Sequence, residues 1–191
     1  MYKLPKRNIE TARLLLQPYA LKYYPLLFPL IQKNKPRLTH SFPKLLSATE
    51  TLEDTRDFVQ HKIFDWNKHK AYGFLIFRKE TYQLIGHFNL KDLDWRSKQC
   101  ELAYFIDEEH NSLGLITEAM KVLLKVCFEE LHLLRVFARI VTTNTASQKV
   151  VEKAGLKYEG TFYQDYTTYD QQVVDTYRYG ISKEDYERAQ K

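Results

Sequence analysis

The stretch from Glu101 to Gly155 most constrains the fold of this chain, because it predicts a strand, a turn, a helix, a strand and a helix in that order. Residues 101–106 have the apolar and aromatic content of a strand, and apolar residues recur at helical spacing over residues 117–131. The turn between them, residues 111–117, reads Asn-Ser-Leu-Gly-Leu-Ile-Thr. A helix that begins here has unpaired N–H groups and a positive dipole end, so the unit predicts an anion-binding site.

The remainder of the chain predicts further strands and helices within one α/β domain of 1–191, because no Pro-, Gly- or Ser-rich stretch divides it. Seven strands are expected, at residues 13–17, 72–78, 84–93, 100–106, 135–141, 157–166 and 173–182. Helices are expected at residues 20–34, 51–70, 117–131 and 145–154, with a short one in the tail at 183–190. The second and third strands are predicted to pair antiparallel through the short connection at residues 79–83.

Two helix starts carry capping signals. Thr51 and Asp54 have the spacing of a capping box, and so do Thr145 and Gln148. Gly155 stands where the second of these helices needs a residue with positive φ to end it. These signals predict the boundaries of both helices.

The charge and composition favour a phosphate-bearing partner. The net charge of +5 and pI of about 9.0 suit a polyanion, which leaves a phosphate-containing cofactor and RNA as alternatives. Basic residues are spread along the chain rather than clustered, which argues against nucleic acid as the main ligand. The 14 tyrosines suit a pocket with polar tips as well as a core.

The cysteines and the hydropathy pattern exclude several other classes. Cys100 and Cys127 are far apart, so the sequence predicts reduced core thiols and no disulfide framework or metal site. No apolar run of signal-peptide length opens the chain, and none approaches the roughly 18 residues of a membrane span. A cytoplasmic protein without a membrane partner is the expectation.

The order of elements resembles that of the GNAT acyltransferase superfamily, and most closely its ribosomal-protein N-terminal acetyltransferases of the RimJ and RimL type. The resemblance extends from Arg13 to about Tyr186. Its motifs are Glu-Leu-Ala-Tyr-Phe-Ile-Asp at 101–107, Gly-Leu-Ile-Thr-Glu-Ala at 114–119, Asn-Thr-Ala-Ser at 144–147 and Glu-Lys-Ala-Gly-Leu at 152–156. It implies a mixed, mostly antiparallel α/β (α+β) sheet of about seven strands, with helices on both faces and the cofactor near its middle. It also implies direct acetyl transfer from acetyl-CoA to a primary amine in a ternary complex.

The resemblance assigns the cofactor to the turn and the elements that flank it. The family turn reads Gln or Arg, two residues, Gly, any residue, then Gly or Ala, whereas this chain has Asn111, Gly114 and Ile116 at the defined positions. A side-chain cation is thus missing at Asn111, and backbone N–H groups are expected to hold the pyrophosphate. The implied cofactor-binding residues are Tyr104, Phe105, Ile106, Ser112, Leu113, Gly114, Leu115, Ile116, Thr117, Asn144 and Ser147.

Three residues are candidates for catalysis. Ser147 matches a position proposed to protonate the leaving thiolate, while Val151 stands where many superfamily members have a tyrosine acid. Glu101 is the first candidate for the general base because it lies in the strand beside the expected thioester, and a structural ion pair is the alternative. Asp165 is the second, although Tyr166 is the aligned residue.

His87, Trp66 and Tyr166 are candidates for contact with the acceptor, and His87 is also a candidate base. A structural role is the alternative for His87, and core packing is the alternative for the two aromatic residues. The acceptor is expected to be a protein N-terminal amine, such as that of a ribosomal protein, or a small amine. A homodimer is compatible with the resemblance alone. The competing functions are an acyl-CoA-binding domain that has lost catalysis and a basic RNA-binding protein that uses its tyrosines for stacking.

Overall fold

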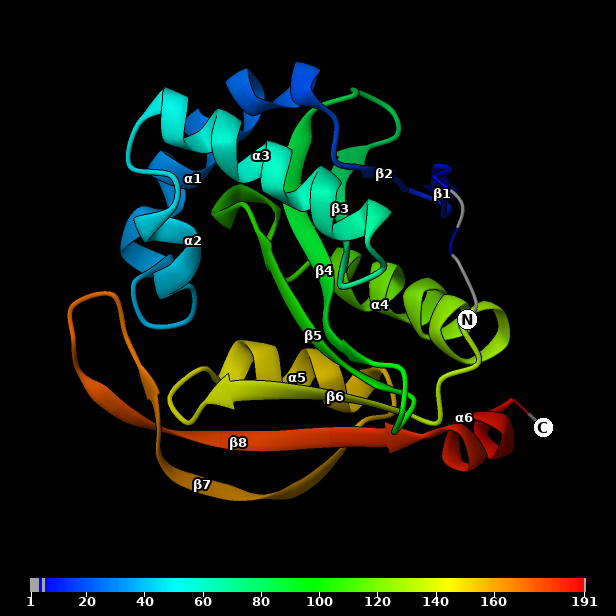
Figure 1. The fold of residues 1–191 in the computed structure, drawn as a ribbon. Helices are drawn as coiled ribbons and strands as arrows, with labels where there is room; N and C mark the ends of the chain where they lie inside the picture. Colours follow the sequence, from blue (N-terminus) through cyan, green and yellow to red (C-terminus); the bar gives the residue numbers. More distant parts are fainter. Residues whose placement is uncertain (1–3, 5, 191) are drawn as a thin grey trace.

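Eight strands form one mixed sheet in the computed structural model, which describes residue 4 and residues 6–190 (Figure 1). Their order across the sheet is β1-β2-β3-β4-β5-β6-β8-β7, and every neighbouring pair except β5 and β6 is antiparallel. The strands are β1 (Ile9–Glu10), β2 (Leu14–Pro18), β3 (Tyr72–Arg78), β4 (Leu84–Asp94), β5 (Gln99–Ile106), β6 (Arg135–Val141), β7 (Lys157–Thr167) and β8 (Val173–Ser182). The predicted mostly antiparallel sheet is confirmed, and the strand beyond the expected seven is the two-residue β1.

One face of the sheet is covered by the helices that precede β3. They are the 3-10 turn η1 (Leu21–Tyr23), α1 (Tyr24–Leu38), α2 (Pro43–Ser47) and α3 (Leu52–Asn67). Helix α1 continues four residues beyond its predicted end and contains Pro29 and Pro36. The capping box at the start of α3 is confirmed, because the Thr51 side chain accepts from the Asp54 N–H at 3.1 Å.

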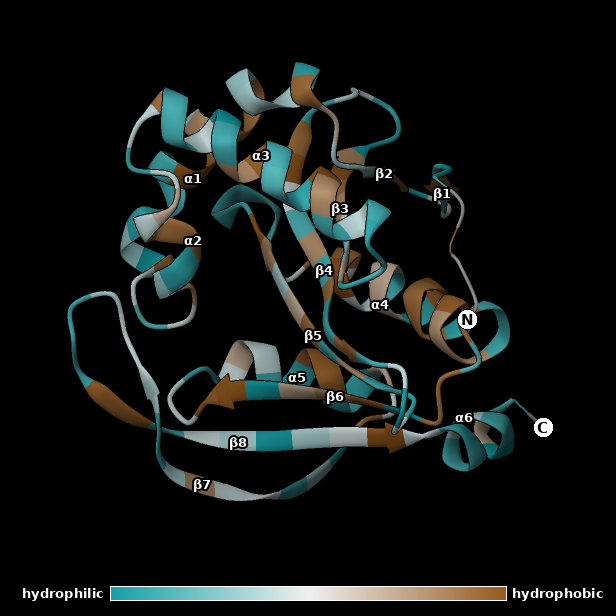
Figure 2. Ribbon diagram, in the orientation of Figure 1, coloured by the Kyte–Doolittle hydropathy of each residue, from teal (hydrophilic) through white to brown (hydrophobic). Residues whose placement is uncertain are grey.

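The other face carries α4 (Leu115–Lys125) and α5 (Thr145–Lys153), with the 3-10 turn η2 (Glu108–His110) leading into α4. The predicted helix over residues 117–131 is α4 followed by η3 (Val126–Glu130), a π-helical turn. Figure 2 shows α4 in brown along much of its length, in keeping with its apolar face against the sheet. Helix α6 (Lys183–Ala189) ends the described chain, in which no helix is long and apolar enough to cross a membrane.

Strands β5 and β6 run side by side for only a short distance. They pair in parallel from Gln99 to Glu101, after which β5 pairs only with β4 and β6 only with β8. In Figure 1 the two strands lie together near α6 and separate toward α2. The backbone of β5 from Leu102 to Ile106 therefore has an unpaired edge that faces the gap, where it is free to bind an extended ligand.

Two apolar clusters fill the two sides of the sheet, one under α4 and α5 and the other under α1, α2 and α3. The expected core thiols are confirmed, because Cys100 and Cys127 are both buried and free. Trp66 is also in the core, where its ring packs edge-on against Tyr72 and Phe74 with centroids 4.9 and 5.1 Å apart.

Candidate active site

Two cavities meet where β5 and β6 separate. One, of about 420 Å³, lies between the turn at 111–117, α1 and α5, and is called the loop cleft below. The other, of about 860 Å³, lies between β4, β5, β6, β7 and α2 and α3, and is called the sheet cavity. Five residues line both of them: Ser41, Phe42, Tyr104, Asn144 and Ser147. A ligand in the loop cleft can therefore reach a second ligand in the sheet cavity at Tyr104 and Ser147.

The turn at the loop cleft has the backbone geometry of an anion site. Ser112 and Gly114 both have positive φ, at 60° and 73°, and Gly114 is the N-cap of α4. Ser112 makes no capping bond to α4, because the N-cap position belongs to Gly114. Because the cap has no side chain, the N–H groups of the first turn of α4 remain available to an anion.

Arg13, the residue before β2, holds this turn in place. Its Nη1 donates to the Leu113 carbonyl at 3.0 Å, and its Nε pairs with the Glu118 carboxylate at 2.7 Å. The Thr11 hydroxyl donates to the same carboxylate at 2.5 Å. Burial alone would raise the pKa of Glu118, but the hydrogen bonds from Thr11 and Arg13 hold it below its usual value. Glu118 therefore stays ionised and anchors the turn to the sheet.

The charges of the loop cleft are all positive. Arg37 from α1 and Lys149 and Lys153 from α5 line it, and no Asp or Glu does. The Asn111 side-chain amide is best satisfied with its oxygen toward Arg37, where it accepts from both Nη atoms at 2.5 and 3.2 Å. The cation missing from the turn in the sequence is thus supplied in space by Arg37.

Asn144 positions the start of α5. Its Oδ1 accepts from the Ser147 N–H at 3.1 Å, so Asn144 is the N-cap and the predicted Thr145 and Gln148 capping box is wrong. Gln148 donates instead to the Thr142 carbonyl at 2.8 Å. The prediction for Gly155 is confirmed, because it has a φ of 95° and directly follows Ala154, the C-cap of the helix. The cap uses only the backbone of Ser147.

Tyr104 and Ser147 stand at the junction of the two cavities. The Tyr104 hydroxyl donates to the Ser147 carbonyl at 3.3 Å, and burial raises the pKa of Tyr104, so the phenol stays neutral. Ser147 lines both cavities, and the hydrogen bond of its side chain to the Tyr104 phenol partly offsets the rise in the pKa of Tyr104.

Glu101 closes the point at which the strands separate. Its carboxylate is buried and accepts from Arg139 Nε at 3.2 Å and Nη2 at 3.0 Å, and Lys91 Nζ lies 3.0 Å from Oε1. The three side chains come from β4, β5 and β6. Both carboxylate oxygens are therefore taken by cations, which favours the structural ion pair over the role of a general base.

Asp165 and Tyr166 reach the sheet cavity from β7. The Asp165 carboxylate accepts from the Thr176 hydroxyl at 2.7 Å, and its nearest cation, Arg139 Nη1, is 3.7 Å away. The Tyr166 hydroxyl donates to the Ser41 carbonyl at 2.9 Å. Burial, with the nearby charge of Glu101, raises the pKa of Tyr166 to about 12, so it is a neutral donor.

His87 also lines the sheet cavity, as a buried and neutral side chain. Its Nδ1 lies 2.7 Å from the Tyr19 hydroxyl, and its ring packs against Phe42 and Phe105. Burial and the positive charge of Lys62 lower the pKa of His87 to about 3. A base this weak is a poor proton acceptor at neutral pH, so His87 fits a polar contact better than a general base.

Three of the candidate site residues line neither cavity. Trp66 belongs to the core, Leu115 is buried under the sheet, and the Leu113 side chain faces solvent. For the two leucines only the backbone N–H groups are placed to serve the turn. All other candidate catalytic, cofactor-binding and acceptor-binding residues line at least one cavity.

The comparison with known families decides the class of the protein. Residues 13–157 match the model of the acetyltransferase (GNAT) domain. The chain belongs to this family. Among curated GNAT relatives, the probable N-acetyltransferase YjcK of Bacillus subtilis is 36% identical over 111 residues, which are 58% of this chain and 61% of YjcK. The ribosomal-protein-serine acetyltransferase of Escherichia coli is 29% identical over 136 residues, 70% of this chain and 73% of that enzyme.

Solved GNAT structures share the fold over nearly the whole chain. RimL, the ribosomal L7/L12 alpha-N-protein acetyltransferase in complex with coenzyme A, superposes with a TM-score of 0.84 at 21% identity, covering 92% of this chain and 98% of RimL. The ribosomal-protein-S5-alanine acetyltransferase of Vibrio fischeri gives a TM-score of 0.85 at 18% identity, with coverage of 94% and 98%. The predicted GNAT fold is thus confirmed, and ribosomal-protein acetyltransferases are among the relatives and structural neighbours, as the resemblance implied.

Proposed function

We propose that this GNAT protein transfers an acetyl group from acetyl-CoA to the primary amine of a second substrate in the sheet cavity. The observation that carries the proposal is the loop cleft, which combines the start of α4 with three cations and no acid, and opens onto the sheet cavity beside Tyr104 and Ser147. A polyphosphate with a long neutral arm fits this distribution of charge.

The proposed site assigns each part of acetyl-CoA to a separate element. The pyrophosphate binds the N–H groups of Leu115, Ile116 and Thr117, with Arg37, Lys149 and Lys153 around the phosphates. The pantetheine arm extends β5 along its free edge from Leu102 to Ile106. This agrees with RimL, which was crystallised with coenzyme A, and with the acetyltransferase MccE, crystallised with acetyl-CoA and AMP.

The reaction proceeds by direct attack. The lone pair of the neutral amine attacks the thioester carbonyl, an N–H of the β5 backbone stabilises the oxyanion, and the C–S bond then breaks. The nitrogen loses one proton to solvent or to a base, and the CoA thiolate gains one proton. Ser147 is the candidate donor of that hydrogen bond or proton, because it lies at the junction of the cavities and its helix cap uses only its backbone N–H.

Asp165 is the better candidate for the acceptor of the amine proton. It lines the sheet cavity and its closest partner is a neutral hydroxyl, whereas both oxygens of Glu101 are occupied by Lys91 and Arg139. The α-amine of a peptide has a pKa of about 8 and is partly neutral at physiological pH, so one carboxylate within reach of a water is sufficient.

A protein N-terminal amine is the proposed acceptor. Several relatives and structural neighbours are named as acetyltransferases of ribosomal proteins, which supports this class of acceptor. The sheet cavity is also about twice the volume of the loop cleft, and this volume exceeds what a small amine needs. A small primary amine is the second candidate.

Calorimetric titration with acetyl-CoA and free CoA tests the cofactor site, and acetylation of peptides tests the reaction. Binding of both ligands in the micromolar range is expected, without competition by a short RNA. Asp165→Asn should lower kcat/KM about 100-fold, against a smaller fall for Glu101→Gln. Absence of CoA binding, or salt-sensitive RNA binding in its place, would contradict the proposal. Binding of CoA without acetylation of any amine would favour the acyl-CoA-binding alternative.

A further inference from the structure

The sheet cavity contains charge that the acetyl-transfer reaction does not use. Four cations line it, namely Lys44, Lys62, Lys91 and Arg139, together with two acids, Glu101 and Asp165. Glu101 is paired with Lys91 and Arg139, and Asp165 with Thr176 and Arg139. The two lysines from the helical side of the cavity, Lys44 and Lys62, have no ion pair among the residues that the structure describes.

Lys62 is the less exposed of these two lysines. It extends from α3 over the Phe58 ring, with Nζ 5.2 Å from the centroid, and burial lowers the pKa of its ammonium group. Asp65 and Asp92 attract it from a distance but form no ion pair with it, and Lys91 repels it. Its own charge depresses the pKa of His87. Lys62 therefore lines the sheet cavity together with His87 and Lys91, and its ammonium group forms no ion pair among the described residues.

Asn89 occupies the intervening position on the same face of β4. Successive residues at i and i+2 point to one face of a strand, so His87, Asn89 and Lys91 line the cavity together. Asn89 is only 5% exposed, its Oδ1 has no hydrogen-bond partner within the described chain, and its Nδ2 takes part in none of the hydrogen bonds of the described residues. A buried amide oxygen without a donor costs about 1–3 kcal/mol, so a backbone N–H of a bound peptide would relieve that penalty, while Nδ2 is the group that can donate to a carboxylate.

We infer that Lys62 and Asn89 form a subsite for a carboxylate carried by the acceptor, so that the preferred substrate is a peptide N-terminus followed closely by an acidic residue. The inference rests on the proposed function. A carboxylate accepts from an ammonium and an amide N–H at once, and in a partly buried cavity such charge-assisted bonds are stronger than in water. Lys44, at the start of α2, adds positive potential on the same side.

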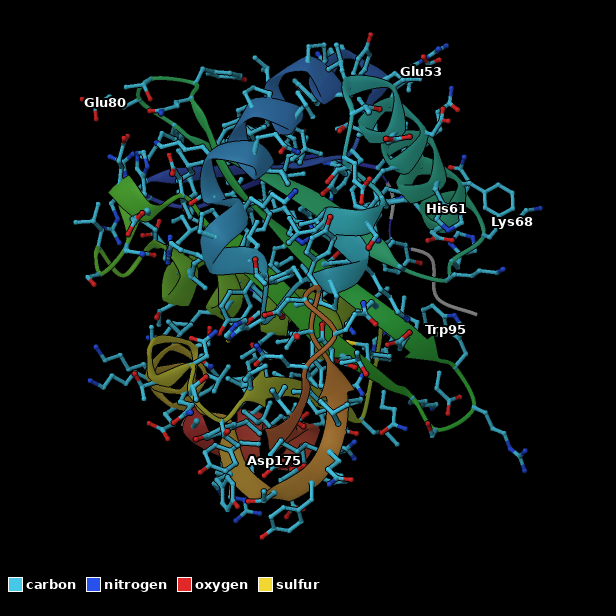
Figure 3. All side chains as sticks on the ribbon, turned by 90° about the vertical axis from the view of Figure 1, so that its left-hand side faces the viewer. Glu53, His61, Lys68, Glu80, Trp95 and Asp175 are labelled. Carbon is cyan, nitrogen blue, oxygen red and sulfur yellow. The ribbon has the colours of Figure 1, made fainter. Side chains whose placement is uncertain are left out.

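A purely structural role for Lys62 predicts something different. In that case the alkyl chain covers Phe58 and the ammonium group serves only to reach water, as for Lys68 over Phe64 on the outer end of α3. Lys68 lines neither cavity, and Figure 3 shows it at the periphery. Lys68 is therefore the matched control.

The test measures kcat/KM for pairs of pentapeptide amides that differ only in glutamate or glutamine at the second or third position. Amidation removes the terminal carboxylate, and the free-acid form of the glutamine peptide tests whether a terminal carboxylate can substitute. The wild-type protein should prefer the glutamate peptide about 10-fold at one or both positions. Lys62→Met should reduce that ratio to near one, Lys62→Arg should retain it, and Asn89→Leu should reduce it about 3-fold. Lys68→Met should leave both rates unchanged.

Two results would overturn the subsite alone, and a third would also count against the reaction. Equal wild-type rates for glutamate and glutamine peptides would show that no carboxylate is read. A fall in both rates of Lys62→Met with an unchanged ratio would show that the lysine is structural. If acetyl-CoA binds but no peptide is acetylated, both the subsite and the proposed protein N-terminal acceptor are wrong, and acetylation of a small amine then decides whether the proposed reaction holds.

Discussion

The loop cleft and the sheet cavity differ in whether their cations are paired with acids. In the loop cleft, Arg37, Lys149 and Lys153 stand without acids, on exposed positions of α1 and α5. In the sheet cavity, Lys91 and Arg139 are held by Glu101 at the buried point where β5 and β6 separate. This difference supports the proposal that the unpaired cations of the loop cleft bind a ligand, whereas the paired cations hold the strands of the sheet cavity together.

The two regions also differ in what a charge costs. Exposed cations keep their hydration, so the folded protein loses little stability when they have no partner, and they remain available to bind an anion. A buried charge needs its partner in the folded protein itself. Lys62 is intermediate between these cases, because it is partly buried but has no ion pair among the described residues. The proposed carboxylate of the acceptor would be its partner.

Reversal of charge in the loop cleft should have the largest effect. Arg37→Glu removes a cation next to Asn111 and places a carboxylate among the phosphates, so the Kd for CoA should rise about 100-fold. Titration calorimetry at low and moderate salt measures this rise, which salt should diminish. Lys68→Glu makes the same charge change at the far end of α3 and should raise Kd less than 3-fold. If both variants behave alike, Arg37 acts only through net charge.

Acid should destabilise the wall of the sheet cavity through His87. Its pKa is about 3 in the folded protein and 6.5 when free, so the unfolded chain binds the additional proton between these values. Stability from this group is complete above pH 6.5 and is lost as pH falls. Between pH 7 and 5 the loss should be about 2 kcal/mol.

Urea unfolding of the wild type and His87→Gln at pH 7 and 5 measures this loss. The variant should lose about 2 kcal/mol less than the wild type over that interval. His61→Gln, on the outer surface of α3 in Figure 3, should keep the wild-type dependence. Equal losses in wild type and His87→Gln would show that the imidazole is charged or accessible in the folded state.

The smallest effect tests the junction of the two regions. Ser147→Ala should lower kcat about 10-fold by removing the hydroxyl that serves the leaving thiolate, while Ser147→Thr should retain most of the rate. The N-cap of α5 uses the backbone N–H of residue 147, so the fold should persist. Thr143→Ala, an exposed neighbour, is the control for kcat measured at saturating acetyl-CoA. An unchanged kcat would assign the proton to water.

Local patterns in the sequence were sufficient for most of the fold. The strands over 72–78, 135–141 and 173–182 have the predicted bounds, because apolar runs with clear turns between them determine both type and length. The second capping signal failed because Asn144, one residue earlier, is the stronger cap and takes the bond. Two-residue β1 carries no periodicity that a sequence can reveal.

The site was predictable only where it is contiguous in the chain. The turn and the residues at 104–106 and 144–147 were identified from motifs that lie within a few residues of one another. Arg37, Lys62 and Asn89 were missed, because their role depends on helices α1 and α3 packing over strands distant in sequence. The pairing of Glu101 with Lys91 and Arg139 depends on strand register, which residue types alone do not fix.

Strands β5 and β6 are paired over only a short distance, and the gap between them ends at Glu101. Only three residues of each strand join the two halves of the sheet, and the ion pairs of Lys91, Glu101 and Arg139 connect β4, β5 and β6 at the closed end of this gap. Any ligand arm that pairs with the free edge of β5 fills this gap from its open end. Ligand binding is therefore expected to make the sheet more rigid, so the protein without a ligand should be the more flexible form.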